Sequence, residues 1–264
     1  MSNRLLLIVA LAVAVGSLAL KADVWDTAGD TDDNSGTDNT PIHGAVQVHD
    51  LGVRPGPVAD QDWYSISAEG RTSYEAVIDG LTGDTGGSLS FQWLAADATT
   101  VLASGVFLGS ASCTTCTQSA RFNNNSSVVA PVFIRVQNPS CGTSCDSSDQ
   151  YTFRLFETTY SIPRFNNSGT QITVLLIQNT AAYTVNANIH FWSPAGTFLG
   201  TSATAIPARG LTVLNTSSLG FAVGTGGSMT VSNDGRYGDL SGKAVALEPS
   251  TGFSFDTPMV PKPL

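Results

Sequence analysis

The alternation of apolar and polar residues is the clearest pattern in this chain. Between residues 88 and 94 the two types alternate with a period of two, as in a half-buried strand. Similar short runs recur at roughly 8–15-residue spacing between clusters of Gly, Pro, Asn and Ser, which is typical of a sandwich or barrel. No segment after residue 22 keeps a 3.6-residue apolar period. The pattern therefore predicts an all-β protein. The other strand-like runs lie at 46–51, 63–67, 74–78, 101–107, 132–136, 151–156, 171–178, 185–192, 198–202, 211–214, 228–231 and 244–247.

Two local features refine the second half of the chain. The run 171–178 (QITVLLIQ) is apolar at both alternating sets of positions, which favours a central strand. The sequence Asn233-Asp234-Gly235 predicts a hairpin turn, because these residues tolerate a positive φ.

The strand-like runs fall into two series that meet near residues 158–160. We expect two β-sandwich domains of jelly-roll or immunoglobulin-like type in series, over 42–158 and 159–257. A connection this short predicts that they abut. Residues 258–264 contain three prolines and form a predicted Pro-rich tail that does not pair in a sheet.

The first residues predict export. Arg4 precedes an unbroken apolar run over residues 5–15, and small residues at Ala19 and Ala22 offer cleavage positions. The run is short for a bilayer core of ~30 Å, so we expect a cleaved signal peptide over residues 1–22, with an uncleaved anchor as the alternative. No later segment approaches a membrane span. The prediction is a secreted or cell-surface protein, with periplasm, surface and medium left open.

The next residues are strongly acidic. Residues 23–41 hold six aspartates and one large apolar residue, Trp25, which predicts a flexible leader. Loss of residues 1–22 removes Arg4 and Lys21 and takes the net charge from −9 to −11. A chain with this charge and no basic cluster is repelled by nucleic acid and by anionic lipid, so we expect no nucleic-acid partner.

Three segments carry a family resemblance: residues 60–66 (DQDWYSI), 133–136 (FIRV) and 151–155 (YTFRL). Together they resemble the bacterial pre-peptidase C-terminal (PPC) domain over about residues 42–158. The resemblance implies a β-sandwich that accompanies secreted bacterial enzymes and has no catalytic residues of its own. This chain departs from that pattern, because no peptidase precedes the segment. A second module follows instead, from 162–167 (IPRFNN) to 252–258 (GFSFDTP), and is similar to uncharacterised modules of secreted bacterial proteins.

The four cysteines form two closely spaced pairs, Cys113 with Cys116 and Cys141 with Cys145. In an exported protein we expect two disulfides, and the short loops favour the two local pairs over cross-linking between the loops. A four-thiolate zinc site and a redox role are the alternatives. Export disfavours reduced thiolates, and no helix follows Cys116 to lower a thiol pKa.

We expect no cofactor, with calcium as the ion that the aspartates leave open. Asp30-x-Asp32-x-Asn34 has the spacing of a calcium loop but lacks the expected Gly and Glu, so a solvated acidic segment is the competing interpretation. Asp60 and Asp62 are better candidates, since they precede a strand; an ordinary capped turn is the alternative there.

One strand offers a candidate ligand face. The more polar side of the run 185–192 carries Asn186, Asn188, His190 and Trp192. This set suits a platform on which the indole stacks on a sugar ring and the amides bind its hydroxyls. Packing of this face against a loop or the first domain is the interpretation that we favour over sugar binding.

Catalytic signatures are missing from the sequence. The three histidines, His43, His49 and His190, form no metalloprotease motif, and no Ser stands in a Gly-x-Ser-x-Gly elbow. His49-Asp50 could supply only part of a triad. We therefore expect a non-catalytic surface module that binds protein or glycan. The alternatives are a self-associating subunit of a fibre, coat or adhesive layer, and accessory domains for a separately encoded enzyme.

Overall fold

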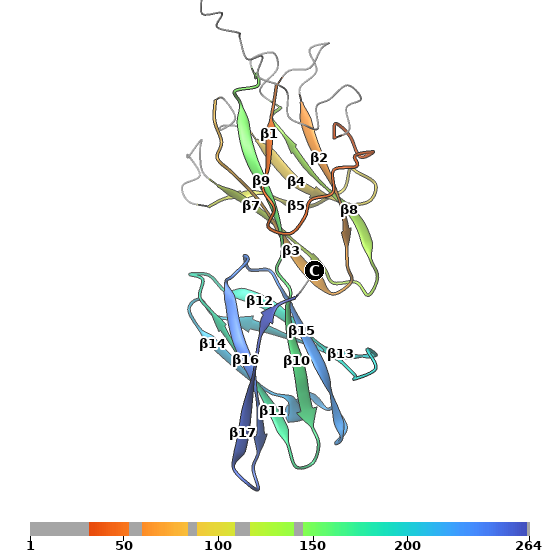
Figure 1. Ribbon diagram of the computed structural model, residues 1–264, viewed down its shortest axis with the longest axis vertical. Coiled ribbons are helices and arrows are strands. Elements are labelled where there is room, and N and C mark those ends of the chain that lie inside the picture. Colours follow the sequence, from red (N-terminus) through yellow and green to blue (C-terminus); the bar gives the residue numbers. More distant parts are fainter. Residues whose placement is uncertain (1–31, 53–59, 84–88, 109–116, 140–144, 263–264) are drawn as a thin grey trace, which may run out of the picture.

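The computed structural model describes residues 32–52, 60–83, 89–108, 117–139 and 145–262, and its strands confirm the all-β prediction (Figure 1). The only helical segment among these residues is a single 3-10 turn, Thr216–Leu219. No helix within the described ranges has the length and apolar character needed to cross a bilayer.

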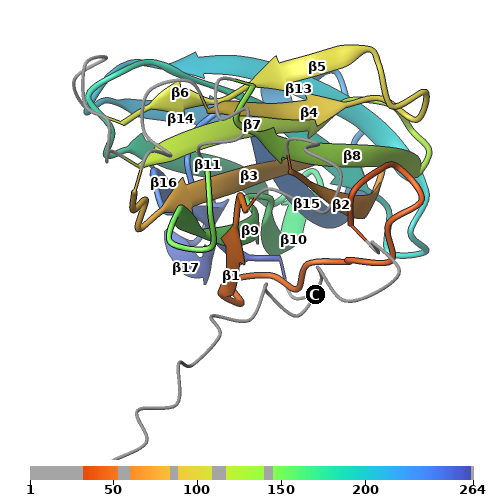
Figure 2. The ribbon, with the colours of Figure 1, turned by 90° about the horizontal axis from the view of Figure 1, so that it is seen from above.

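The first sandwich consists of two antiparallel sheets, seen from above in Figure 2. Its core is filled by the inward residues of both sheets, which are the apolar positions of the alternating pattern. One sheet has the order β1 (Gln47–Asp50), β9 (Gln150–Glu157), β3 (Thr72–Asp79), β7 (Gln118–Asn124), β6 (Val106–Phe107). The other has the order β2 (Gln61–Ala68), β8 (Ala130–Gln137), β4 (Ser90–Leu94), β5 (Val101–Ser104).

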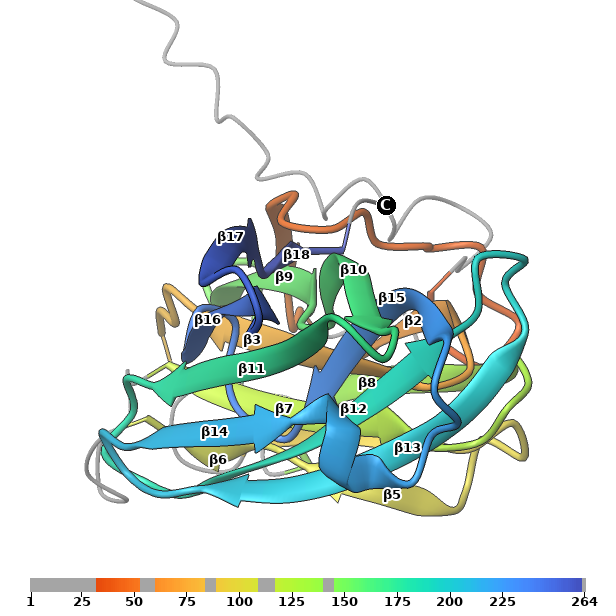
Figure 3. The same cartoon turned by 90° about the horizontal axis from the view of Figure 1, so that it is seen from below.

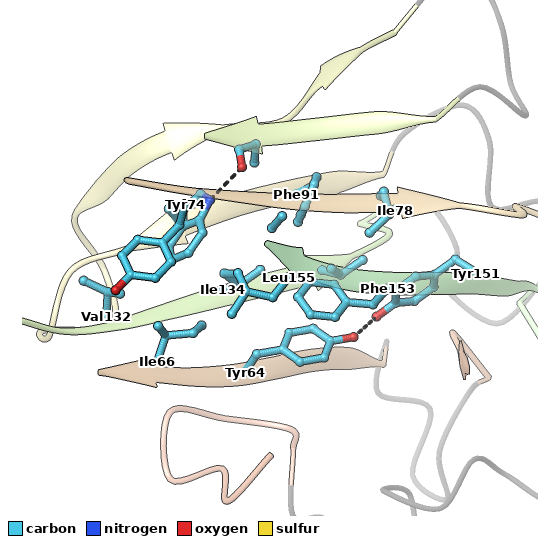
Figure 4. Close-up of a cluster of buried hydrophobic side chains, with 14 of the residues drawn as sticks. Tyr64, Ile66, Tyr74, Ile78, Phe91, Val132, Ile134, Tyr151, Phe153 and Leu155 are labelled. Carbon is cyan, nitrogen blue, oxygen red and sulfur yellow. Dashed lines mark hydrogen bonds between the residues drawn. The ribbon is translucent and has the colours of Figure 1, made fainter. Parts of the chain in front are cut away.

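Aromatic side chains join the two sheets of this first core. Tyr64 of β2 stacks on Phe153 of β9 with ring centroids 3.9 Å apart (Figure 4). Trp93 of β4 is fully buried, and its indole N–H donates to the carbonyl of Ala120 in β7 at 3.0 Å. Because these contacts cross from sheet to sheet, they fix how the two layers face each other.

The second sandwich repeats this architecture around a separate core (Figure 3). One sheet has the order β13 (Phe198–Ile206), β12 (Val185–Trp192), β15 (Thr225–Asn233), β10 (Tyr160–Asn167), β18 (Val260–Pro261). The other has the order β14 (Leu211–Asn215), β11 (Ile172–Asn179), β16 (Leu240–Glu248), β17 (Phe253–Pro258). β11 is an interior strand of its sheet.

The chain passes from one sandwich to the other through two residues, Thr158 and Thr159, between β9 and β10. Both are buried. Thr158 N–H donates to the carbonyl of Ser73 at 2.8 Å, and Ser73 N–H donates to the hydroxyl of Thr159 at 2.9 Å. From the second sandwich, the side-chain amide of Asn233 donates to the carbonyl of Thr158 at 2.9 Å. The junction is therefore held from both sides.

The C-terminal segment differs from its prediction. Residues 258–264 were expected not to pair in a sheet, but Pro258 ends β17 and β18 pairs with β10. Lys262 N–H also donates to the carbonyl of Thr159 at 2.9 Å. Proline removes only its own N–H, so its carbonyl and the neighbouring amides still bond at a sheet edge, where β18 lies.

The leader differs as well. Its described part, residues 32–41, lies along β2 instead of forming the flexible segment that its acidity predicts. Trp63 N–H donates to the carbonyl of Asp32 at 2.7 Å, and Ser65 N–H donates to the carbonyl of Asn39 at 2.9 Å. Backbone hydrogen bonds to β2 hold this part of the leader. Such bonds cannot be predicted from the apolar composition of the segment.

Candidate functional site

A buried cluster of three titratable side chains lies where the leader meets the first sandwich. Asp32 comes from the leader, His49 from β1 and Asp62 from β2, and all three side chains are 0 % exposed. β1 and β2 belong to different sheets, so the cluster lies between the two layers. His49 Nδ1 is 3.3 Å from Asp62 Oδ1 and 3.7 Å from Asp32 Oδ2. One ligand atom from each residue lies within 4.8 Å of the others, so the three could hold a metal ion.

Two tyrosines orient the carboxylate of Asp62. Tyr151 donates its hydroxyl proton to Asp62 Oδ2 at 2.6 Å. The hydroxyl oxygens of Tyr151 and Tyr64 lie 2.9 Å apart (Figure 4). Burial, and then the charge of Asp62, raises the pKa of Tyr151 well above its usual value. Tyr151 therefore stays protonated and donates to Oδ2, and Asp62 Oδ1 faces His49.

A second chain of bonds orients His49. Its Nε2 lies 3.1 Å from Gln47 Oε1, and the Gln47 amide nitrogen donates to Asn39 Oδ1 at 3.0 Å. A carbonyl oxygen only accepts hydrogen bonds, so Nε2 carries the proton in this arrangement. Nδ1 is then the ring atom that faces the two carboxylates.

The sequence located this cluster only in part. It singled out the three residues separately: Asp62 as a partner of Asp60, Asp32 within the alternative calcium spacing, and His49 as part of a triad. Asp60 is buried, and its Oδ1 accepts from the Gln61 N–H at 2.8 Å, but it does not belong to the cluster of three. Asp30, the first residue of the alternative calcium spacing, lies outside the described residues. The one signal that could have been used is the alternation itself, which puts Asp62 on the inward face of β2 with Tyr64.

The candidate ligand face on β12 is partly covered by the first sandwich. The Asn188 amide donates to Asn125 Oδ1 at 3.2 Å, and the guanidinium of Arg71 lies 5.6 Å from the ring centroid of Trp192. The indole N–H of Trp192 donates to the Thr230 hydroxyl. Asn186 is exposed, and its amide donates to Asp234 Oδ2 at 2.7 Å. Most of this face thus takes part in packing and hydrogen bonding within the protein.

His190, the remaining member of that face, is buried between two hydroxyl groups. Its ring nitrogens lie 2.9 Å from Thr201 Oγ1 and 3.0 Å from Ser232 Oγ. Burial, and then the positive charge of Arg71, lowers the pKa of His190 to about 4. The imidazole is therefore neutral in the folded protein at neutral pH.

This lowered pKa predicts a loss of stability in acid. The unfolded His190 takes up a proton below about pH 6.5 and the folded one does so only near its lowered pKa. Its contribution is therefore full above pH 6.5 and is lost as the pH falls toward 4, by roughly 2–3 kcal/mol in total. The measurement is urea denaturation of wild type and His190→Gln from pH 7 to pH 4. Over this range the free energy of unfolding of wild type should fall by roughly 2–3 kcal/mol more than that of the variant. Parallel pH profiles for the two proteins would contradict the assignment.

An uncovered apolar surface lies on the second sandwich. Leu175 and Ile177 of β11 point into the core, so alternate residues of β11 point outward. Register places Leu176 beside Val213 of β14, and Val174 beside Val245 of β16. Val213 is 59 % exposed and Leu211 is 54 % exposed. We call this surface the aliphatic face; it consists of Ile172, Val174, Leu176, Leu211, Val213, Val245 and Leu247. Figure 3 shows β14, β11 and β16 adjacent in one layer.

The predicted disulfides fall mostly outside the described part of the chain. Cys113, Cys116 and Cys141 lie in segments that the structure does not describe, and Cys145 is buried. Both the disulfides and their connectivity stay predictions. Mass measurement before and after reduction would test for free thiols, and mass mapping of an unreduced digest would test the pairing.

Comparisons with known proteins identify no family. No family model and no curated protein matches the chain. Among solved structures, it is similar to β-glucuronidase 2 of Bacteroides uniformis, as a calcium-binding mutant (11% identity, TM-score 0.19) and covalently bound to cyclophellitol-6-carboxylate aziridine (10% identity, TM-score 0.19). Each match covers 74% of this chain and 26% of the glucuronidase, so the chain spans about a quarter of that protein's length. A likeness with this TM-score carries no argument about fold or activity.

Proposed function

We propose that the protein is an exported, non-catalytic module that acts by binding another protein at the cell surface. The observation that carries this proposal is the aliphatic face. The solvent side of an antiparallel sheet is ordinarily polar, and contiguous exposed apolar surface is typical of interaction sites. Seven aliphatic residues on three adjacent strands form such a surface here, and the polar residues that the register of these strands places beside them on the same side of the sheet are Gln178, Asn215 and Lys243.

The chemistry of the aliphatic face favours a protein over a glycan as partner. Sugar hydroxyls need several hydrogen-bonding groups, and on these three strands only the same three polar residues offer them beside the seven aliphatic side chains. The aliphatic side chains fit the apolar centre of a protein interface. The aromatic alternative is weaker, because Arg71 lies over Trp192 and its indole N–H already bonds to Thr230.

A non-catalytic role is supported by the burial of the best-equipped chemical cluster. Asp32, His49 and Asp62 combine acid, base and metal-binding groups, but their side chains are 0 % exposed. A general acid or base must come within hydrogen-bonding reach of its substrate. Among the described residues, this cluster is thus placed to support structure. The resemblance to the PPC domain agrees with such a role, since it implies an accessory sandwich.

Self-association is the second candidate function. A second copy of this chain could bury the same aliphatic face and so build a fibre, coat or adhesive layer. The open edge strands β14 and β17 of that sheet add a route for strand pairing.

We expect Val213→Lys to weaken partner binding by about tenfold or more, since a charge would be buried within an apolar contact. Val213 is exposed on an edge strand, so folding should be unaffected. Ala203→Lys, on exposed β13 of the opposite sheet, is the matched control. The readout is the amount of labelled protein retained by the cells that produce it. Equal retention of both variants would contradict the proposal.

Sedimentation velocity on the same proteins separates the two candidates. A wild-type monomer at all concentrations supports a foreign partner. Concentration-dependent assembly of wild type that is lost in Val213→Lys would instead support the second candidate, a self-associating subunit.

A further inference from the structure

We propose that Asp32, His49 and Asp62 form a binding site for one divalent transition-metal ion of the zinc type, which fastens the leader to the first sandwich. The three residues come from three successive segments, the leader, β1 and β2, and one ligand atom of each lies within 4.8 Å of the other two.

The distances within the cluster fit a shared ion better than a direct ion pair. Charge-assisted N–H···O bonds are ordinarily about 2.7–2.9 Å long. The two separations from His49 Nδ1 are 3.3 and 3.7 Å. Ligands at about 2.0–2.2 Å from a tetrahedral zinc ion lie roughly 3.3–3.6 Å from one another. The two separations from His49 are close to this spacing, and the two aspartate oxygens lie within 4.8 Å of each other.

The tautomer of His49 points the same way. With the Nε2 proton directed at Gln47 Oε1, the lone pair of a neutral imidazole lies on Nδ1, which faces the carboxylate oxygens of Asp32 and Asp62. In this tautomer Nδ1 offers the lone pair that a metal ion takes from a neutral imidazole. A metal-binding histidine commonly donates its other ring N–H to an oxygen in this way.

The carboxylate of Asp62 is oriented as a ligand should be. Tyr151 donates to Oδ2 at 2.6 Å, which fixes the group and turns Oδ1 toward His49. Hydrogen bonds from surrounding residues to ligating carboxylates are a usual feature of metal sites.

The donor set selects the class of ion. Calcium prefers six to eight oxygen ligands, and imidazole is uncommon among them. One imidazole and two carboxylates suit zinc and related divalent ions, whose charge two aspartates balance. The three side chains supply three of the four positions around a tetrahedral ion and leave the fourth for water or another group, and their full burial shields the bound ion from bulk solvent.

The competing arrangement is a protonated His49 that pairs with both aspartates without a metal. Calorimetric titration of chelator-treated full-length protein with Zn²⁺ decides between the two. We expect one ion per chain and a melting temperature raised by about 5–10 °C at a hundredfold excess over the Kd. Absence of stoichiometric Zn²⁺ binding, or tighter binding of Ca²⁺ than of Zn²⁺, would overturn the proposal.

Variants assign the ion to these residues. Asp32→Asn alters only the leader, so the sandwich should remain folded, and His49→Gln removes the imidazole. Each should weaken Zn²⁺ binding at least tenfold. His190→Gln is the matched control, because it removes a buried histidine whose ring partners are hydroxyls, and it should bind as wild type does. Co²⁺ gives a second readout, a visible absorption band of the bound ion that the first two variants lose. Unchanged Zn²⁺ affinity in Asp32→Asn and His49→Gln would contradict the site.

Discussion

Replacing Trp93 with alanine should lower the free energy of unfolding by about 4 kcal/mol, one of the largest effects of any single substitution in this protein. Trp93 is fully buried at the centre of the first core. Its ring stacks on Phe122 of the opposite sheet with centroids 5.2 Å apart, and its N–H reaches the Ala120 carbonyl. Truncation would leave a cavity and remove a bond between the sheets.

The measurement is equilibrium urea denaturation followed by intrinsic fluorescence and circular dichroism. Leu102→Ala, an aliphatic truncation at a position that is 42 % exposed on edge strand β5, is the control and should change stability by under about 0.5 kcal/mol. If Trp93→Ala cost no more than Leu102→Ala, the core of the first sandwich would not be built as described.

Replacing Asn233 with alanine should cost roughly 2–4 kcal/mol and weaken the coupling between the sandwiches. The Asn233 side chain donates to the Thr158 carbonyl at the junction, and its Oδ1 accepts from the Gly235 N–H at 2.9 Å. Asn233 is 2 % exposed, so alanine would leave both backbone groups buried without these partners.

Other contacts also cross the junction. The carboxylate of Glu75 in β3 accepts from the Tyr237 N–H of the second sandwich at 2.8 Å, and the Ser119 hydroxyl of its own sandwich donates to the other carboxylate oxygen at 2.5 Å. Phe156 and Tyr237 stack with ring centroids 4.8 Å apart. With these bonds in place, we expect wild-type protein to unfold in one calorimetric transition.

Differential scanning calorimetry tests this coupling. Asn233→Ala should lower and broaden the transition or divide it in two, whereas Asn186→Ala, at an exposed position of β12, should leave a single transition. Two well-separated transitions in the wild-type protein would show that the junction does not couple the sandwiches.

Periodicity predicted the strands well because alternate burial is what the sandwich imposes. The run 88–94 shows this, since Phe91 and Trp93 are buried and Gln92 is not. The same rule gave an incomplete account of 171–178. Apolar residues on both sides favoured a central strand, and β11 is interior to its sheet, but its outward side chains are partly exposed. Composition reports that a residue is apolar, and it does not report whether a second layer covers it.

The candidate site was harder to predict for a different reason. Asp32, His49 and Asp62 come together only because the leader lies along β2 and because β1 and β2 face each other across the sandwich. Backbone bonds hold the leader, and they leave no trace in composition. The pairing of β18 with β10 escaped prediction likewise, because it uses the amides and carbonyls beside the prolines.

The central claim is that the protein binds a partner protein through the aliphatic face. Site-directed photo-crosslinking on intact producing cells tests it most directly, with a photoreactive amino acid at Val213 and, as control, at Ala203. We predict a discrete cross-linked species containing a second protein from position 213, and none from position 203. Cross-links from both positions alike, or from neither, would contradict binding through this face.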